Sequence, residues 1–111
     1  LYLPDHDRFE VLDGGGLPLG VERTHRYETH VRHALPAGAV IVAATDGLYE
    51  IAAEGDDARF GVDGLKAAVR TCPAEGANAI ASAILEAATA HGGGVSLRDD
   101  ATFVVFRLAG G

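Results

Sequence analysis

The sequence predicts an α+β fold with mainly antiparallel strands and two adjacent helices. Short apolar segments with strand-like patterns occupy the first half of the chain, and apolar residues at helical spacing occupy the second. One further apolar, β-branched segment closes the chain, so strands and helices do not alternate as they do in parallel βαβ proteins. The length of 111 residues corresponds to one domain at most, which we assign to residues 1–111.

Three features of the first half predict strands. Residues 1–3 and 9–12 are apolar-rich and flank a turn-forming segment, a pattern typical of a hairpin. Residues 27–33 alternate with a period of two, which indicates a half-buried strand. One face would carry Tyr27, Thr29, Val31 and His33, and the other Glu28, His30 and Arg32. Residues 40–44 are continuously apolar, which predicts a strand covered on both faces.

The second half predicts two helices and a closing strand. Two sets of apolar residues have helical spacing: Leu65, Ala68, Val69 and Cys72, then Ile80, Ile84, Leu85 and Ala88. Pro73 separates the two helices, and the glycines at 92–94 end the second. Cys72 is interpreted as a small core residue. Residues 101–108 predict the last strand.

Composition excludes several classes of function. Nine basic residues against 16 acidic ones give a net charge of -7, which does not suit binding to nucleic acid or to an anionic membrane through a broad basic face. The single cysteine excludes an internal disulfide framework. No apolar segment has the length of a membrane span and the start does not resemble a signal peptide, so we expect a cytoplasmic location.

Acidic residues adjoin two of the predicted strands. Asp46 directly follows residues 40–44, and Asp99 and Asp100 directly precede the last strand. If these strands are antiparallel neighbours, Asp46 and Asp99 meet at one rim of the sheet, where Mg²⁺ or Mn²⁺ would favour carboxylate oxygens and Gly47 would leave room. The same residues also suit an ordinary turn and a loop cap, so spacing alone leaves both interpretations open.

A set of motifs in fixed order resembles one protein family. These motifs are Gly16–Gly20, Leu35–Gly38, Thr45–Glu50, Arg59–Gly61 and Asp99–Val105. Together they resemble the C-terminal part of the bacterial metal-dependent serine/threonine protein phosphatases of the PPM (type 2C) family, in the branch of stage II sporulation protein E. The resemblance covers nearly the whole chain and implies part of a four-layer αββα sandwich.

The resemblance also implies a site and a reaction. Asp46 and Asp99 match two metal-binding aspartates, while Gly47 and Asp100 match positions that line the site. Two Mn²⁺ or Mg²⁺ ions in the complete domain would activate a water that hydrolyses phosphoserine or phosphothreonine on a regulatory protein. The resemblance implies no catalytic side chain beyond this metal-bound water.

The chain departs from the family pattern at its N-terminal end. The family's first metal aspartate, in a Gly-Asp-x-x-Gly-His-Gly motif, has no counterpart here, and the sequence contains no methionine and begins with Leu1. We therefore expect the C-terminal portion of a larger domain. The alternative is a non-catalytic protein-interaction module with a phosphatase-like fold.

Several partners are expected. The resemblance implies a phosphorylated anti-sigma-factor antagonist as substrate and an upstream sensor or regulatory domain. Strand edges exposed in such a portion would favour self-association.

Three other groups of residues are of types that also occur in functional sites. His25, His30 and His33 do not share one face of a strand, so surface positions are favoured over a metal site. The glycines at 14–16 lack the Gly-Lys-Ser/Thr of a phosphate loop. The acidic segment from Glu50 to Asp57 is either a flap near the site or a solvated loop.

Overall fold

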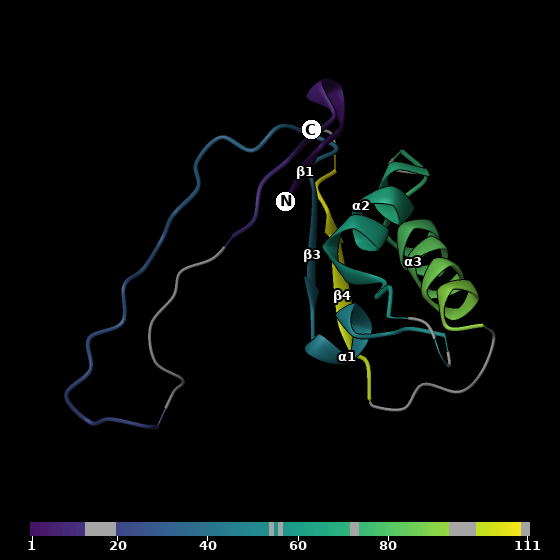
Figure 1. The fold of residues 1–111 in the computed structure, drawn as a ribbon. Helices are drawn as coiled ribbons and strands as arrows, with labels where there is room; N and C mark the ends of the chain where they lie inside the picture. The colour runs from purple at the N-terminus through teal and green to yellow at the C-terminus, as the bar shows by residue number, and fades with distance from the viewer. Residues whose placement is uncertain (13–19, 54, 56, 72–73, 94–99, 110–111) are drawn as a thin grey trace.

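The computed structural model of the chain describes residues 1–12, 20–53, 55, 57–71, 74–93 and 100–109. Figure 1 shows their arrangement. The described residues form strands β1 (Tyr2–Leu3), β2 (Arg8–Phe9), β3 (Val40–Ala44) and β4 (Phe103–Arg107), and helices α1 (Asp46–Tyr49), α2 (Gly61–Thr71) and α3 (Ala77–His91), with a 3-10 turn at Pro4–His6.

The strands form a single antiparallel sheet in the order β2-β1-β3-β4. Its longest ladder joins β3 to β4, from Val40 opposite Arg107 to Ala44 opposite Phe103. β1 pairs with β3 at one position only, Tyr2 opposite Val40. The predicted α+β class with antiparallel strands is confirmed, while the four-layer sandwich stays a prediction because the described residues form one sheet and one layer of helices.

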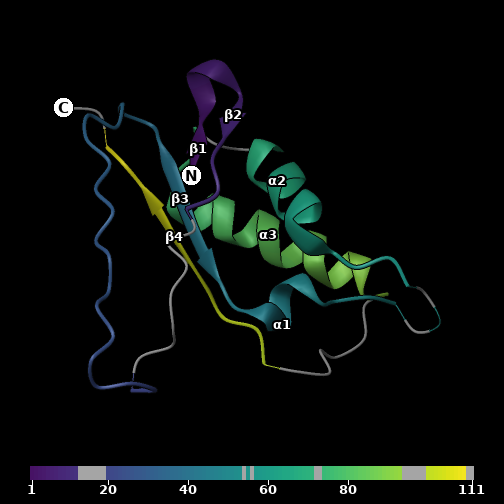
Figure 2. The ribbon, with the colours of Figure 1, turned by 60° about the vertical axis from the view of Figure 1, so that its left-hand side comes forward.

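Helices α2 and α3 cover one face of the sheet (Figure 2). The two helices pack on each other because both carry apolar stripes, and the core includes Leu65, Val69, Ile80 and Ile84. Both predicted helices are confirmed, with one error: Leu85 is 54% exposed, so the buried stripe of α3 is Ile80, Ile84 and Ala88. The expected core position of Cys72 lies outside the described residues.

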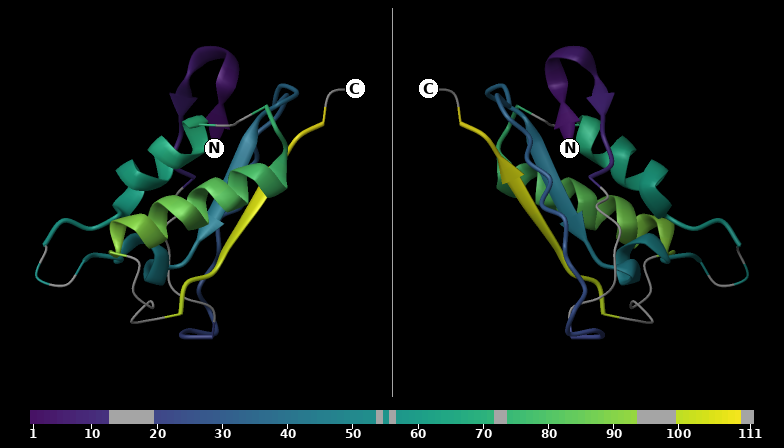
Figure 3. Two further views of the ribbon diagram at one scale, coloured as in Figure 1. Left: turned by 90° about the vertical axis from the view of Figure 1, so that its right-hand side faces the viewer. Right: turned by 90° about the vertical axis from the view of Figure 1, so that its left-hand side faces the viewer.

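The opposite face of the sheet is not covered by the described residues. Val42 and Val105 pack against the core, whereas their neighbours on the other face, Val104 and Phe106, are 47% and 55% exposed. The two side views in Figure 3 show α2 and α3 lying against the sheet. The prediction that residues 40–44 are covered on both faces was therefore wrong for the part of the chain described here, although the strand itself has the predicted bounds.

Residues 20–36 form an extended arm that stands away from the sheet, on the side opposite the helices (Figure 1). The predicted strand at 27–33 is not formed, and Tyr27 and Val31 are 44% and 66% exposed. A strand needs a neighbouring strand for its backbone hydrogen bonds, and the alternation within one segment does not determine whether such a neighbour is present. Arg32 joins the arm to the end of β2 through an ion pair of 2.7 Å with Glu10.

The β1–β2 hairpin is confirmed, in shorter form, and is fastened to α2. The rings of Tyr2 and Phe9 stack with centroids 4.4 Å apart. Asp7 adopts a left-handed conformation with φ 45°, accepts a hydrogen bond from the Tyr2 hydroxyl at 3.0 Å, and pairs with Arg70 of α2 at 2.9 Å. These contacts hold the hairpin against the helical layer.

Candidate metal centre at one rim of the sheet

The end of β3 and the approach to β4 meet at the same rim. The backbone N–H of Thr45 donates to the carbonyl oxygen of Thr102 at 2.9 Å, and the N–H of Thr102 donates to Oγ1 of Thr45 at 3.0 Å. These bonds extend the β3–β4 ladder by one position beyond Ala44 and Phe103. The predicted antiparallel pairing is therefore confirmed, and it brings the segments around Asp46 and Asp100 together.

Gly47 lies in direct backbone contact with Asp100. A Cβ atom at Gly47 would overlap the carbonyl oxygen of Asp100 and lie 2.8 Å from its carbonyl carbon. Only a residue without a side chain permits this approach. Gly47 thus allows the two acidic segments to touch, which is a more specific role than the open space expected from the sequence.

Asp46 opens a short helix that the sequence did not indicate. The chain after Thr45 makes one helical turn, α1, in which Leu48 is 1% exposed and anchors the turn in the core. The N–H of Glu50 closes the turn by donating to the carbonyl oxygen of Asp46 at 2.9 Å. Asp46 itself is exposed, so its carboxylate can reach a ligand at the rim without a cost of burial.

The second predicted ligand, Asp99, lies outside the described residues, so its pairing with Asp46 stays a prediction. Asp100, expected to line the site, is exposed and adjoins Gly47. Within the described ranges, no group of three or more histidine, cysteine or acidic residues could hold a metal ion, and this includes the histidines of the arm. A complete ligand set is therefore not formed by the described part of the chain.

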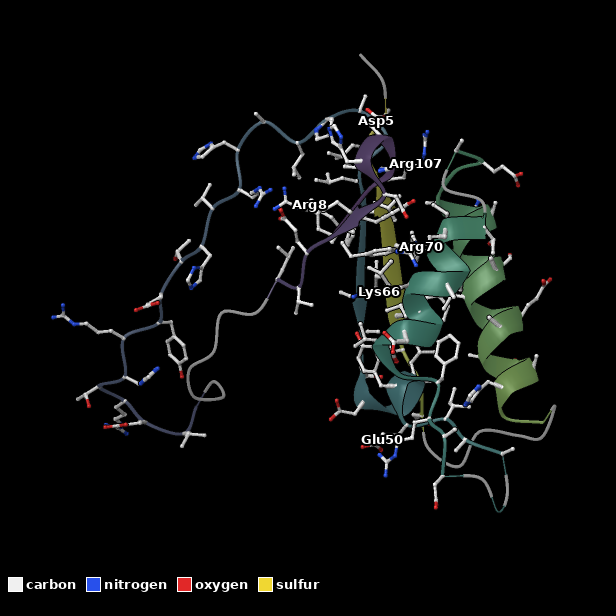
Figure 4. The ribbon with its side chains drawn as sticks, turned by 45° about the horizontal axis from the view of Figure 1, so that its top comes forward. Asp5, Arg8, Glu50, Lys66, Arg70 and Arg107 are labelled. Atoms are coloured by element: carbon white, nitrogen blue, oxygen red, sulfur yellow. The ribbon has the colours of Figure 1, made fainter. Side chains whose placement is uncertain are left out.

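Residues after α1 return to the core beside the rim. Phe60 is 4% exposed, its N–H donates to the carbonyl oxygen of Ile51 at 2.7 Å, and its ring meets that of His91 edge-on. His91 Nε2 also lies 2.8 Å from the carbonyl oxygen of Ala58. Figure 4 shows Glu50 at this end of the molecule, and its carboxylate lies 3.8 Å from Arg59. Sequence reasoning missed these contacts, although Phe60 offered a signal as an isolated aromatic residue after an acidic segment.

In the part of the chain that the structure describes, no helix combines the length and apolar character that crossing a bilayer requires.

The antiparallel sheet and its layer of helices define an α+β protein, and one rim of the sheet carries the exposed residues Asp46 and Asp100, called the acidic rim below. The family model of stage II sporulation protein E (SpoIIE) matches residues 1–109. The chain belongs to this family, which is a family of PP2C-like phosphatases. Comparison with curated proteins gave no significant match, and neither did comparison with solved structures.

Proposed function

We propose that this chain is the C-terminal portion of a metal-dependent serine/threonine protein phosphatase. The observation that carries the proposal is the contact between Gly47 and Asp100, because it joins two acidic segments that are far apart in the sequence. Family membership supports the same reaction class.

The residues at the rim fit a hard divalent cation. Asp46 and Asp99 would hold Mn²⁺ or Mg²⁺ through carboxylate oxygens, with Gly47 and Asp100 lining the site. When bound, such ions lower the pKa of a water and neutralise the charge of a phosphoryl group. The chain itself carries a net charge of -7 and would otherwise repel a phosphate dianion, so the acidic rim requires a cation before it can receive this substrate.

The chain would work as part of a larger domain. The first metal aspartate of the proposed site would come from the N-terminal half, in a Gly-Asp-x-x-Gly-His-Gly motif, and the full site would hold two ions. The substrate would be a phosphoserine or phosphothreonine of a regulatory protein in the cytoplasm, by resemblance an anti-sigma-factor antagonist. A sensor or regulatory domain upstream would control the activity.

The test is release of phosphate from a phosphoserine protein by the complete domain, with and without Mn²⁺. We expect Mn²⁺-dependent turnover that falls by more than about a hundredfold in Asp46→Asn and Asp99→Asn, because loss of outer-shell contacts alone costs about ten- to a hundredfold.

Asp5→Asn is the control for the loss of one carboxylate. Asp5 lies in the 3-10 turn, at the opposite end of the molecule from Glu50 (Figure 4), so turnover should not change. Unchanged turnover in the Asp46 and Asp99 variants would refute the site. Absence of any turnover in the complete domain would favour the non-catalytic interaction module.

A further inference from the structure

Two short segments after α1, residues 50–53 and 57–60, are joined to each other. The N–H of Phe60 donates to the carbonyl oxygen of Ile51 at 2.7 Å, and both residues are buried. Next to this bond, the carboxylate of Glu50 lies 3.8 Å from the guanidinium group of Arg59. These contacts fasten the two segments, called the paired segments below, directly behind the helix that carries one proposed metal ligand.

The C-terminal end of α3 packs on the paired segments (Figure 2). His91 Nε2 lies 2.8 Å from the carbonyl oxygen of Ala58, and because a carbonyl oxygen can only accept, Nε2 is the donor. The ring of His91 also meets that of Phe60 edge-on, with centroids 5.9 Å apart. Gly92 is buried beside Ile51, since a Cβ atom at Gly92 would lie 3.1 Å from Cγ2 of Ile51. The end of α3 therefore contacts both paired segments.

These contacts connect the two parts of the chain that carry the proposed metal ligands. The N–H of Glu50 donates to the carbonyl oxygen of Asp46 at 2.9 Å, so the paired segments continue directly from the turn that presents the Asp46 carboxylate. Helix α3 ends at His91, and the sequence then leads to Asp99. The contact between α3 and the paired segments is therefore a second connection between the two acidic parts, in addition to the backbone contact at the acidic rim.

We propose that His91 is a positioning residue for the divalent cation and acts through its hydrogen bond to Ala58. This inference rests on the proposed function, because it takes Asp46 and Asp99 as ligands. Side chains that hold metal ligands in place without touching the ion contribute about ten- to a hundredfold to metal affinity. His91 restricts the movement of the paired segments relative to α3 before the ion binds. Without this restriction, the ion itself must order both parts of the chain, and its affinity falls.

The experiment is isothermal titration of the complete domain with Mn²⁺. We expect the dissociation constant for Mn²⁺ to rise about tenfold in His91→Ala, because the donor to Ala58 is lost. The amide of glutamine can donate to the same carbonyl oxygen, so His91→Gln should keep most of the affinity. His6→Ala is the matched control, since His6 is an exposed histidine in the 3-10 turn, and it should bind Mn²⁺ as the unchanged domain does.

Amide hydrogen exchange in NMR measures the restriction itself. In His91→Ala, exchange of the Phe60 amide, which bonds to Ile51, should accelerate about tenfold, since the paired segments open more often when a hydrogen bond to α3 is lost. The amide of Leu108 bonds to the carbonyl oxygen of Ala39 at 3.0 Å, beyond the far end of the β3–β4 ladder. Its exchange should not change, because the opening is local.

Equal Mn²⁺ affinity of His91→Ala and the unchanged domain, together with faster exchange at Phe60, would overturn the proposal, because the contact would then be structural only. A loss of affinity that His91→Gln does not restore, or that His6→Ala shares, would also overturn it.

The titration needs no substrate, so it separates this inference from the proposed reaction. A domain that binds Mn²⁺ but releases no phosphate would refute the phosphatase activity, while weaker binding in His91→Ala alone would still support the role of His91. A complete domain that binds no Mn²⁺ would overturn both proposals.

Discussion

Gly47 and its neighbours show how closely this fold constrains single residues. The glycine is buried at the contact with Asp100, whereas Asp46 beside it is exposed. The two adjacent residues therefore differ in how far a substitution affects the stability of the fold. Gly47 has no space for a side chain, whereas Asp46 has room around it. Stability measurements can separate the structural residue from the proposed ligand.

Gly47→Ala is expected to destabilise the chain by about 1–3 kcal/mol, because the new methyl group overlaps the carbonyl of Asp100 and forces the backbone apart. Urea unfolding followed by circular dichroism measures the change. Asp46→Asn is the control and should remain within about 0.5 kcal/mol, as is usual for an exposed position. Equal stability of Gly47→Ala and the unchanged chain would contradict the close approach.

Asp7 links the hairpin to α2 and makes stability depend on pH. The hydrogen bond from Arg70, followed by that from Tyr2, lowers the pKa of Asp7 below its ordinary value of 3.8. A lowered pKa in the folded state means that the unfolded chain binds protons first, so this contribution is present above about pH 4 and is lost as pH falls through the folded pKa.

Asp7→Asn should therefore destabilise the chain at pH 7, and the difference from the unchanged chain should shrink as pH falls below about 4. Thermal unfolding across this range provides the measurement. Asp63→Asn, which removes an exposed carboxylate from α2, is the control. A difference that stays constant down to the lowest pH would exclude the proposed linkage.

At the scale of elements, α3 shows how a helix distributes its apolar residues. Ile84 is fully buried, while the next residue, Leu85, is 54% exposed, because successive residues point about 100° apart around a helix. Periodicity predicted the helix correctly but did not define the width of its buried stripe. Only the packing of α3 on α2 and β4 does so.

Ile84→Ala is expected to cost about 2–5 kcal/mol, and Leu85→Ala less than about 1 kcal/mol, since only the first creates a cavity. Chemical denaturation of the two variants gives a comparison between adjacent helical positions. Similar losses for both would mean that Leu85 is covered in solution.

At the scale of the whole molecule, one face of the β3–β4 pair is apolar and open in the described part of the chain. Val104 and Phe106 of β4 are about half exposed on this face. An uncovered apolar face and an open strand edge both favour association with another surface. The proposed N-terminal half would cover such surfaces in the complete domain.

The isolated chain is accordingly expected to self-associate, with a mass in light scattering at least about twice that of the monomer at high concentration. Phe106→Lys combined with Val104→Lys should shift the chain toward the monomer. Lysine at Val21 and Val31, which are 64% and 66% exposed on the arm, is the control pair. A monodisperse monomer for the unchanged chain would contradict this expectation.

Local pattern determined a large part of this protein. Helical spacing located α2 and α3, a β-branched segment located β3, and the motifs around Asp46 and Asp99 indicated the family. Each of these depends on residues close in the chain. The tertiary structure alone decided which face of β3 is covered, that residues 27–33 do not form a strand, and that Gly47 touches Asp100. These depend on which distant segments meet, and the period of a single segment carries no information about its partner.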